Sequence, residues 1–400
     1  MKILIASHSS NLVHPGGAET AAFAQANYMR SKGHEVVHIA CHPGLDEDFG
    51  YEKNTNTHLI KSSTETGSFL WDSDRTAILW AERLSEIKPD VVHLHHYLNC
   101  GILLPALIKK ILPTAKVILT FHEYLAICGR SGQMIDKNGN LCESSGIRKC
   151  SSCLDASPKA VAINVSLIEL GLQYVDEFIS PSQFLLERYV SWGIPRGKIH
   201  KIENFLNIKL PNTPNPTDSA NSTSIVINFV SQHTPTKGLE VLLQAILDLK
   251  VLSPSTLRKV RFNIWGSGSE RWPDFHSRVE ELKELTRNHA FFMGKYQPQD
   301  LARIYAGSSY TIVPSTWWEN APCVIQESLA FGIPVIGSDI GGIAELLSSA
   351  TGSITFAVGD SLALANAITK ATKSPSETHA VQKTPNNDDT HKRHLEVYNC

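Results

Sequence analysis

Charge of either sign is scarce in this 400-residue sequence. Asp, Glu, Lys and Arg make up 19% of the residues, and the formal net charge at pH 7 is -2. A chain without an overall basic field has little with which to neutralise phosphates, so we expect no nucleic-acid partner. The apolar share of 42% is that of an ordinary globular protein with enough material for two hydrophobic cores.

Long apolar runs are also missing. No stretch approaches the roughly 20 apolar residues that span a bilayer, and the first run, Lys2–Ala6, is too short for a signal peptide. We therefore expect a cytoplasmic protein. Leu103–Lys116 combines apolar residues with three lysines. That segment fits a peripheral contact with the inner face of a membrane and fits an ordinary surface helix equally well.

Cysteines number only 8, and half of them gather in one segment as Cys128, Cys142, Cys150 and Cys153. Scattered and clustered thiols of this kind make a poor disulfide framework. The closing Cys-x2-Cys with two thiols upstream could supply the four thiolates of a structural zinc site. The spacings are irregular for a zinc ribbon, so disulfides, free thiols and an iron–sulfur cluster stay open as alternatives.

Apolar strands alternate with helical patterns in both halves of the chain, which indicates parallel sheets covered on both faces. We therefore predict an α/β protein of two facing Rossmann-like domains. Ligands of open α/β sheets bind at the carboxyl ends of the strands, so an interdomain cleft is expected. The predicted strands are Lys2–Ala6, Glu35–Ala40, Val91–Leu94, Lys116–Phe121, Glu177–Ser180, Ile225–Val230, Val260–Trp265, Tyr310–Val313 and Ile333–Ile336.

Composition places the domain boundaries. Residues 210–224 are rich in Pro, Asn, Thr and Ser and read as a linker. It separates a domain at 1–209, whose Cys-rich insertion covers about 123–157, from a domain at 225–378. Residues 379–400 form a tail that becomes weakly helical at His394–Tyr398. A closing helix that packs back on the first domain is one arrangement for this tail.

Two glutamates carry the strongest motif. Glu319 stands just ahead of Pro322, which suits the first turn of a helix. Glu327 then lies inside that helix, on the order of 10 Å further along at about 1.5 Å per residue. When an acid and a nucleophile act on one glycosidic bond, their carboxyl groups are separated by roughly 5–10 Å at most. The two carboxylates could instead bracket one extended ligand, with free helix N–H groups between them.

Other candidate residues stand where strands end or helices begin. Gly16 and Gly17 open a helix and permit close approach of an anion, while Lys237 could pair with a phosphate. His122 and Gly266 each follow a predicted strand. Taken singly, each of these residues is more often structural than functional. The fingerprint G-x-G-x-x-G is absent after Ala6, which argues against a dehydrogenase.

With these motifs the sequence resembles the family 4 glycosyltransferases over nearly its whole length. Their signature is two glutamates with seven residues between them, followed by a small-residue helix, Gly-x-Pro and a strand. Glu319, Glu327, Gly332 and Pro334 match it. The resemblance implies a GT-B fold and transfer, with retention, from a nucleoside diphosphate sugar to a glycan or lipid-linked acceptor hydroxyl. It implies polysaccharide or glycolipid assembly as the setting, and no cofactor for catalysis.

The resemblance also implies residue roles. Glu327 would bind the ribose hydroxyls, Lys237 would clamp the diphosphate, and His122 would contact the donor sugar. A Cys-rich loop after this histidine is similar to that of a subset of the family. The implied catalytic residues are His122 and Glu319, and the implied donor-binding residues are Gly16, Gly17, Lys237, Gly266, Asn320, Ala321, Pro322, Cys323, Val324 and Glu327.

One position departs from the family pattern. Gln232 stands where the family has an arginine that helps to clamp the diphosphate, and Gln cannot give a bidentate charged contact. Arg271 and Lys295 are candidates to replace that charge. We therefore keep two alternatives: a catalytically impaired sugar-nucleotide-binding protein, and a sugar-nucleotide epimerase or phosphorylase on the same scaffold.

Overall fold

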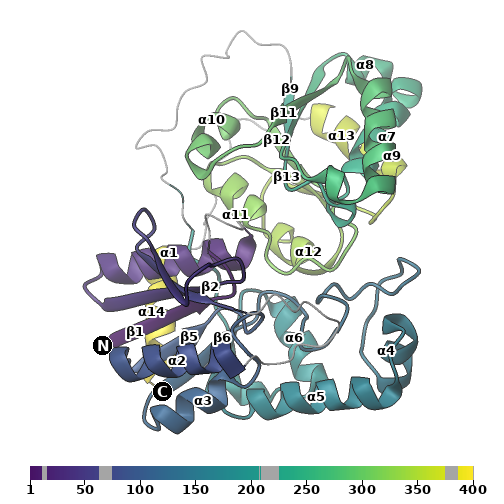
Figure 1. The fold of residues 1–400 in the computed structure, drawn as a ribbon. Coiled ribbons are helices and arrows are strands. Elements are labelled where there is room, and N and C mark those ends of the chain that lie inside the picture. The colour runs from purple at the N-terminus through teal and green to yellow at the C-terminus, as the bar shows by residue number, and fades with distance from the viewer. Residues whose placement is uncertain (11–15, 63–73, 207, 209–224, 374–385, 400) are drawn as a thin grey trace. The chain divides into compact units, whose positions relative to one another are not determined.

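The computed structural model describes residues 1–10, 16–62, 74–206, 208, 225–373 and 386–399. The chain divides into two compact units, Met1–Asn207 with Pro385–Cys400, and Ile208–Thr384 (Figure 1). The predicted linker at 210–224 lies outside the described residues, and so does the start of the tail at 379–385. Each unit is an open α/β sheet, which confirms the predicted fold class.

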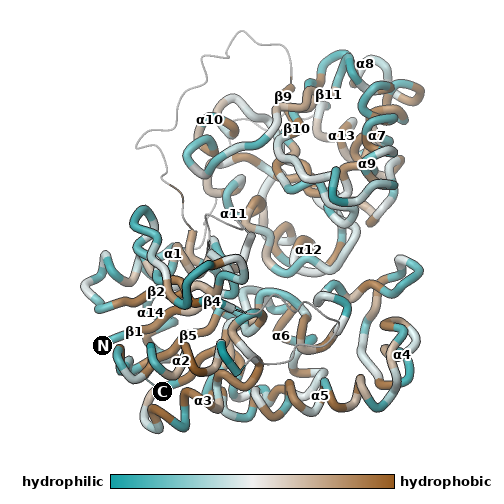
Figure 2. The backbone as a smooth tube through the Cα atoms, in the orientation of Figure 1, coloured by the Kyte–Doolittle hydropathy of each residue, from teal (hydrophilic) through white to brown (hydrophobic). Residues whose placement is uncertain are grey.

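The first unit is built on an eight-stranded sheet in the order β3-β4-β2-β1-β5-β6-β7-β8. Every described pairing is parallel except β3 with β4, which is antiparallel. The central strands are almost wholly apolar, as the brown tube of β1 and β5 shows in Figure 2. The strands are β1 Lys2–Ser7, β2 Glu35–His42, β3 Phe49–Glu52, β4 Thr57–Lys61, β5 Val91–Leu94, β6 Lys116–Thr120, β7 Glu177–Ser180 and β8 Ile199–Lys201.

Helices α1 and α14 cover one face of this sheet. Met29 of α1 and Val397 of α14 share a core with Ile3, Ile5 and other strand residues. The carboxyl-terminal helix therefore belongs to the first unit, and it runs over Asn387–Asn399 rather than only His394–Tyr398. The helices of this unit are α1 Gly17–Ser31, α2 Asp74–Ile87, α3 Leu104–Ile111, α4 Ile147–Leu154, α5 Pro158–Leu172, α6 Gln183–Trp192, η1 Arg196–Lys198 and α14 Asn387–Asn399.

The second unit holds a six-stranded, fully parallel sheet in the order β11-β10-β9-β12-β13-β14. Helices α7, α9 and α13 pack together beside it in one apolar core. Its elements are β9 Ile225–Val230, η2 Pro235–Lys237, α7 Leu239–Leu252, α8 Pro254–Leu257, β10 Val260–Trp265, η3 Ser269–Arg271, α9 Pro273–Thr286, β11 Ala290–Gly294, η4 Pro298–Asp300, α10 Leu301–Tyr305, β12 Tyr310–Val313, α11 Cys323–Ala330, β13 Val335–Ser338, α12 Gly341–Leu347, β14 Ile354–Phe356 and α13 Ser361–Lys373.

One predicted strand is misplaced. The apolar run Ile333–Ile336 predicted its own range, but the strand is Val335–Ser338. Pro334 has no N–H for a sheet ladder, and Gly332 turns the chain with a φ of 74°. The strand therefore starts only after the proline.

Within the segment Leu103–Lys116 the structure forms α3, Leu104–Ile111, which buries one face. Leu104, Pro105 and Ile108 of α3 are buried, so the apolar face is covered within the unit. The Lys109 ammonium lies 2.6 Å from a carboxylate oxygen of Asp176. These contacts favour the structural interpretation over a membrane contact for this segment. In the part of the chain described, no helix is long and apolar enough to cross a bilayer.

Candidate active site

Side chains of the first unit converge at the carboxyl ends of three neighbouring strands. His8 follows β1, His95 and His96 follow β5, and His122 follows β6. Strand β5 pairs with both β1 and β6, so these residues are adjacent along one sheet edge. The rings of His8 and His96 lie 4.4 Å apart, and those of His95 and His122 lie 5.2 Å apart.

The Gly16-Gly17 turn places a carboxylate at this edge. Gly16 precedes α1, and a Cβ added to it would lie 2.5 Å from Oε2 of Glu19. Glu19 is buried, and its Oε1 lies 3.0 Å from Nε2 of His8. Burial raises the pKa of Glu19, but the contact with His8, the residue's own backbone N–H and nearby His96 together outweigh it, so the pKa lies below its usual value. The turn thus carries an ionised carboxylate beside the N-terminus of α1.

His96 and Glu123 form a second pair. The backbone N–H of Leu98 donates to Nδ1 of His96 over 2.8 Å, so the ring proton sits on Nε2. That nitrogen faces Oε1 of Glu123 at 3.2 Å. Burial raises the pKa of Glu123 to about 8. The Glu123 carboxyl is therefore held mainly in its protonated form at neutral pH.

In the second unit the two charged motif residues contact each other. Nζ of Lys237 lies 2.6 Å from Oε1 of Glu319, and Ser315 Oγ donates to the same oxygen over 2.8 Å. Lys237 also stands 5.4 Å from the ring centre of Trp317. Glu319 is buried, and Lys237 and Ser315 are both partners of its Oε1. A diphosphate at Lys237 would share the ammonium with Glu319.

The loop ahead of α11 is held by backbone contacts. The carbonyl of Glu319 accepts from the N–H of Gly342 over 2.8 Å, and a Cβ on Gly342 would lie 1.5 Å from the carbonyl oxygen of Asn320. Only glycine fits there. Pro322 has no N–H and precedes the first helical residue, Cys323, so the backbone N–H groups of Ala321, Cys323 and Val324 lie at a helix N-terminus.

Glu327 lies in the middle of α11, one face of which is buried. Burial raises the pKa of Glu327 to about 7 and that of Cys323 to about 12. A carboxyl that titrates near neutrality can accept hydrogen bonds from hydroxyls once it ionises. The thiol of Cys323 stays protonated, so the structure gives it no role as a nucleophile.

Glycines bring backbone segments of the second unit together. Gly266 has a φ of 123°, and a Cβ there would lie 1.8 Å from the carbonyl oxygen of Ser231. Gly238 has a φ of 74°, and a Cβ there would lie 1.8 Å from the carbonyl oxygen of Pro314. The turns after β9, β10 and β12 are therefore tightly joined at one edge of the sheet.

Gln232, at the position of the family arginine, is exposed after β9. Arg271 ends η3, just beyond the Gly266 turn, and Lys295 follows β11. Both are exposed, and β9, β10 and β11 are consecutive in the sheet. The two candidate replacement cations thus stand at the same edge of the sheet as Gln232.

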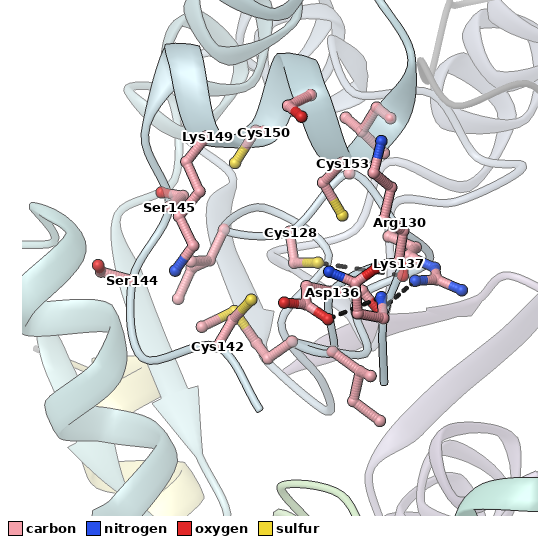
Figure 3. A pocket seen from close by; sticks show the side chains of 17 residues that line it. Cys128, Arg130, Asp136, Lys137, Cys142, Ser144, Ser145, Lys149, Cys150 and Cys153 are labelled. Atoms are coloured by element: carbon pink, nitrogen blue, oxygen red, sulfur yellow. Dashed lines mark hydrogen bonds between the residues drawn. The ribbon is translucent and has the colours of Figure 1, made fainter. Parts of the chain in front are cut away.

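The four clustered cysteines line one pocket of the first unit, with a cavity volume of about 290 Å³ (Figure 3). Cys150 and Cys153 come from α4, while Cys128 and Cys142 come from the loops opposite. Among the described residues, none of these four cysteines forms a disulfide. Among the residues that the structure describes, no group of three or more His, Cys, Asp or Glu side chains is arranged to hold a metal ion. The zinc site therefore stays a prediction.

Sequence reasoning treated the site residues one by one and missed several partners. The motifs did not predict the Lys237–Glu319 pair, because the two residues are 82 positions apart in the sequence. The motifs gave no role to Glu19, His95, His96 or Glu123. Histidines directly after the strand Val91–Leu94, as at His122, are the signal that could have pointed to His95 and His96.

Two α/β units with charged and glycine-rich turns at their strand ends place this protein in a class of two-domain α/β proteins. Comparison with family models identifies the family. The model described as "Glycosyltransferase Family 4" matches residues 15–210, and the one described as "Glycosyl transferases group 1" matches residues 224–374. The chain belongs to the family 4 glycosyltransferases.

Individual relatives match a part of the chain. The spore coat protein SA of Bacillus subtilis is 27% identical over 122 residues, which is 30% of this chain and 32% of the relative. The D-inositol 3-phosphate glycosyltransferase of Corynebacterium aurimucosum is 32% identical over 123 residues, which is 30% of this chain and 28% of the relative. These matches thus span about a third of each curated relative.

Solved structures match over the full length. Anabaena HepE in complex with UDP has a TM-score of 0.69 at 17% identity, covering 100% of both chains. Sucrose-phosphate synthase from Thermosynechococcus elongatus has a TM-score of 0.72 at 15% identity, covering 100% of this chain and 98% of the other. At such identities the likeness shows the fold, which is the GT-B arrangement of two parallel-sheet domains.

Proposed function

We propose that this protein is a retaining glycosyltransferase that moves a hexosyl group from a nucleoside diphosphate sugar to an acceptor hydroxyl. The observation that carries the proposal is the second unit's strand edge. There Lys237 contacts Glu319 directly ahead of a helix N-terminus, and Glu327 follows within that helix. A cation, a helix N-terminus and a titrating carboxyl match the three parts of such a donor: diphosphate, sugar and ribose.

The proposed chemistry needs little from the protein beyond charge and position. The bond between the anomeric carbon and the diphosphate oxygen breaks, and the acceptor oxygen bonds to that carbon on the same face. The acceptor proton passes to the departing diphosphate. Lys237 and the amides of the Gly16-Gly17 turn would stabilise the leaving group, while Glu327 would hold the nucleoside. His122 and Glu319 would contact the sugar.

The acceptor we propose is a glycan or a lipid-linked glycan, in polysaccharide or glycolipid assembly. A lipid-linked acceptor would bring the protein to the inner face of a membrane, as a peripheral and otherwise cytoplasmic enzyme. The relative from Corynebacterium aurimucosum is named for a small sugar alcohol phosphate, so small acceptors belong in the test as well.

Nucleotide release tests the proposal. The protein is incubated with UDP-, GDP- and ADP-sugars, each with and without pooled glycan acceptors. UDP-sugars come first, because UDP is the ligand in the HepE complex. We expect release with one nucleotide, and loss of donor binding or turnover in Glu327→Ala. Donor kinetics that are unchanged in that variant would refute the placement of the nucleoside.

The second candidate is a sugar-nucleotide-binding protein without transfer activity. The exposed Gln232 favours it, because this position lacks the charge of the family arginine. Donor binding without nucleotide release under any acceptor would decide for this alternative.

A further inference from the structure

A row of buried polar side chains leads from the interior of the first unit to His122. Gln25 comes from α1, His93 from β5, His95 from just beyond β5, and Tyr398 from α14. None of these four is more than 4% exposed. Buried polar groups at this depth are held by hydrogen bonds, and the direction of each bond decides which nitrogens carry protons.

The Gln25 side chain determines which ring nitrogen of His95 carries the proton. Its side-chain oxygen lies 2.7 Å from Nε2 of His95, and its side-chain nitrogen donates to the Tyr398 hydroxyl over 2.7 Å. The same nitrogen lies 3.0 Å from Nδ1 of His93. An amide oxygen can only accept, so Nε2 of His95 carries the proton. Burial lowers the pKa of His95 well below its usual range, so the ring is neutral and its Nδ1 is an acceptor.

The protonation of His95 in turn determines which ring nitrogen of His122 donates a hydrogen bond. Nδ1 of His95 lies 2.9 Å from Nε2 of His122. Because the first nitrogen accepts, the second must donate. Burial lowers the pKa of His122 to about 3, so this ring is neutral as well, and its Nδ1 has no proton. The two rings are stacked at an interplanar angle of 19°, which also holds the orientation of His122.

We infer that Gln25 and His95 are positioning residues that hold His122 in the tautomer with its proton on Nε2. His122 then offers Nδ1 as a hydrogen-bond acceptor. This nitrogen can take a hydroxyl of the donor sugar, and it cannot give a proton to the leaving diphosphate. The inference rests on the proposed function for its ligand, while the tautomer itself is a property of the free protein.

Nitrogen-15 spectroscopy of histidine-labelled protein tests the tautomer without any activity. The His95 and His122 signals are assigned with His95→Asn and His122→Asn. We expect a single neutral tautomer of His122 with the proton on Nε2. A His122 ring that carries its proton on Nδ1, or that exchanges between both tautomers, would overturn the inference.

Variants test the role of Gln25. Gln25→Leu removes the acceptor for His95, and we expect mixed tautomers at His122 and a donor kcat/KM reduced about tenfold. Tyr398→Phe is the matched control, because it removes one buried hydroxyl of the same row but leaves the Gln25–His95 contact. In a His122→Ala background the Gln25→Leu substitution should cost no further activity.

These measurements separate two kinds of failure. The predicted tautomer in a protein that transfers no sugar would refute the proposed function and leave the positioning role standing. If the loss of kcat/KM caused by Gln25→Leu adds fully to the loss caused by His122→Ala, Gln25 acts only on the fold. That result would remove the positioning role while the transfer activity stood.

Discussion

At the scale of single residues, Glu327 is expected to make donor binding depend on pH. Its pKa in the folded protein is raised to about 7, so the carboxyl ionises as the pH rises through neutrality. The ionised form accepts two hydroxyl hydrogen bonds, whereas the protonated form is a poorer acceptor. We therefore predict tighter binding of the donor sugar nucleotide at pH 8 than at pH 6, measured by calorimetry.

Glu327→Gln is the control for that measurement. It keeps the shape of the side chain and removes the titration, so its weaker binding should vary little over the same pH range. A wild-type affinity that falls as the pH rises, or a variant that keeps the wild-type profile, would contradict the assignment of Glu327 to the ribose.

We predict that removing only Lys237 destabilises the fold more than removing both charges of the Lys237–Glu319 pair. Lys237→Met leaves the buried Glu319 carboxylate without its cation, and we expect the free energy of unfolding to fall by about 1–3 kcal/mol. The double variant Lys237→Met/Glu319→Gln should recover part of this loss, as read from urea denaturation. If the losses in unfolding free energy of the two single substitutions add in the double variant, the contact contributes nothing to stability.

At the scale of elements, the turns after β10 and β11 are predicted to supply the charge that Gln232 does not. Arg271→Gln and Lys295→Gln should each weaken donor binding several-fold and lower its dependence on salt. Lys259→Gln is the matched control, since Lys259 is an exposed cation at the opposite end of β10. Equal effects of all three would refute a local phosphate site at these turns.

The Cys-rich loop is the second element with a measurable prediction. The zinc site proposed for Cys128, Cys142, Cys150 and Cys153 requires the pocket to close around a metal ion. We expect about one zinc per freshly purified chain, lost together with the loop's resistance to protease when a chelator is added. Less than about 0.2 zinc per chain with four reactive thiols would refute it.

Which elements could be read from the sequence depended on their burial. Val91–Leu94, Glu177–Ser180, Ile225–Val230, Val260–Trp265 and Tyr310–Val313 agree with their predictions residue for residue. These strands are mostly buried on both faces and therefore read as continuous apolar runs. The five strands that were missed, β3, β4, β8, β11 and β14, are short and stand at or beside sheet edges. Partly exposed edge strands need no such run.

At the scale of the whole molecule, the alternation of strands and helices was enough to predict the fold class, because period and order are local properties. The site was predictable only as separate motifs. Contacts such as His96 with Glu123, or Lys237 with Glu319, join residues that neighbouring parallel strands bring together, and the sequence spacing of these residues does not predict them. The helix α14 likewise packs beside β1 from the far end of the chain.

The stereochemistry of the reaction product shows whether the proposed glycosyl transfer proceeds with retention. With the donor that releases nucleotide, proton NMR of the first product formed gives the configuration at the anomeric carbon. We predict that the product keeps the anomeric configuration of the donor and that Glu327→Ala forms no product. A product of inverted configuration would contradict this prediction.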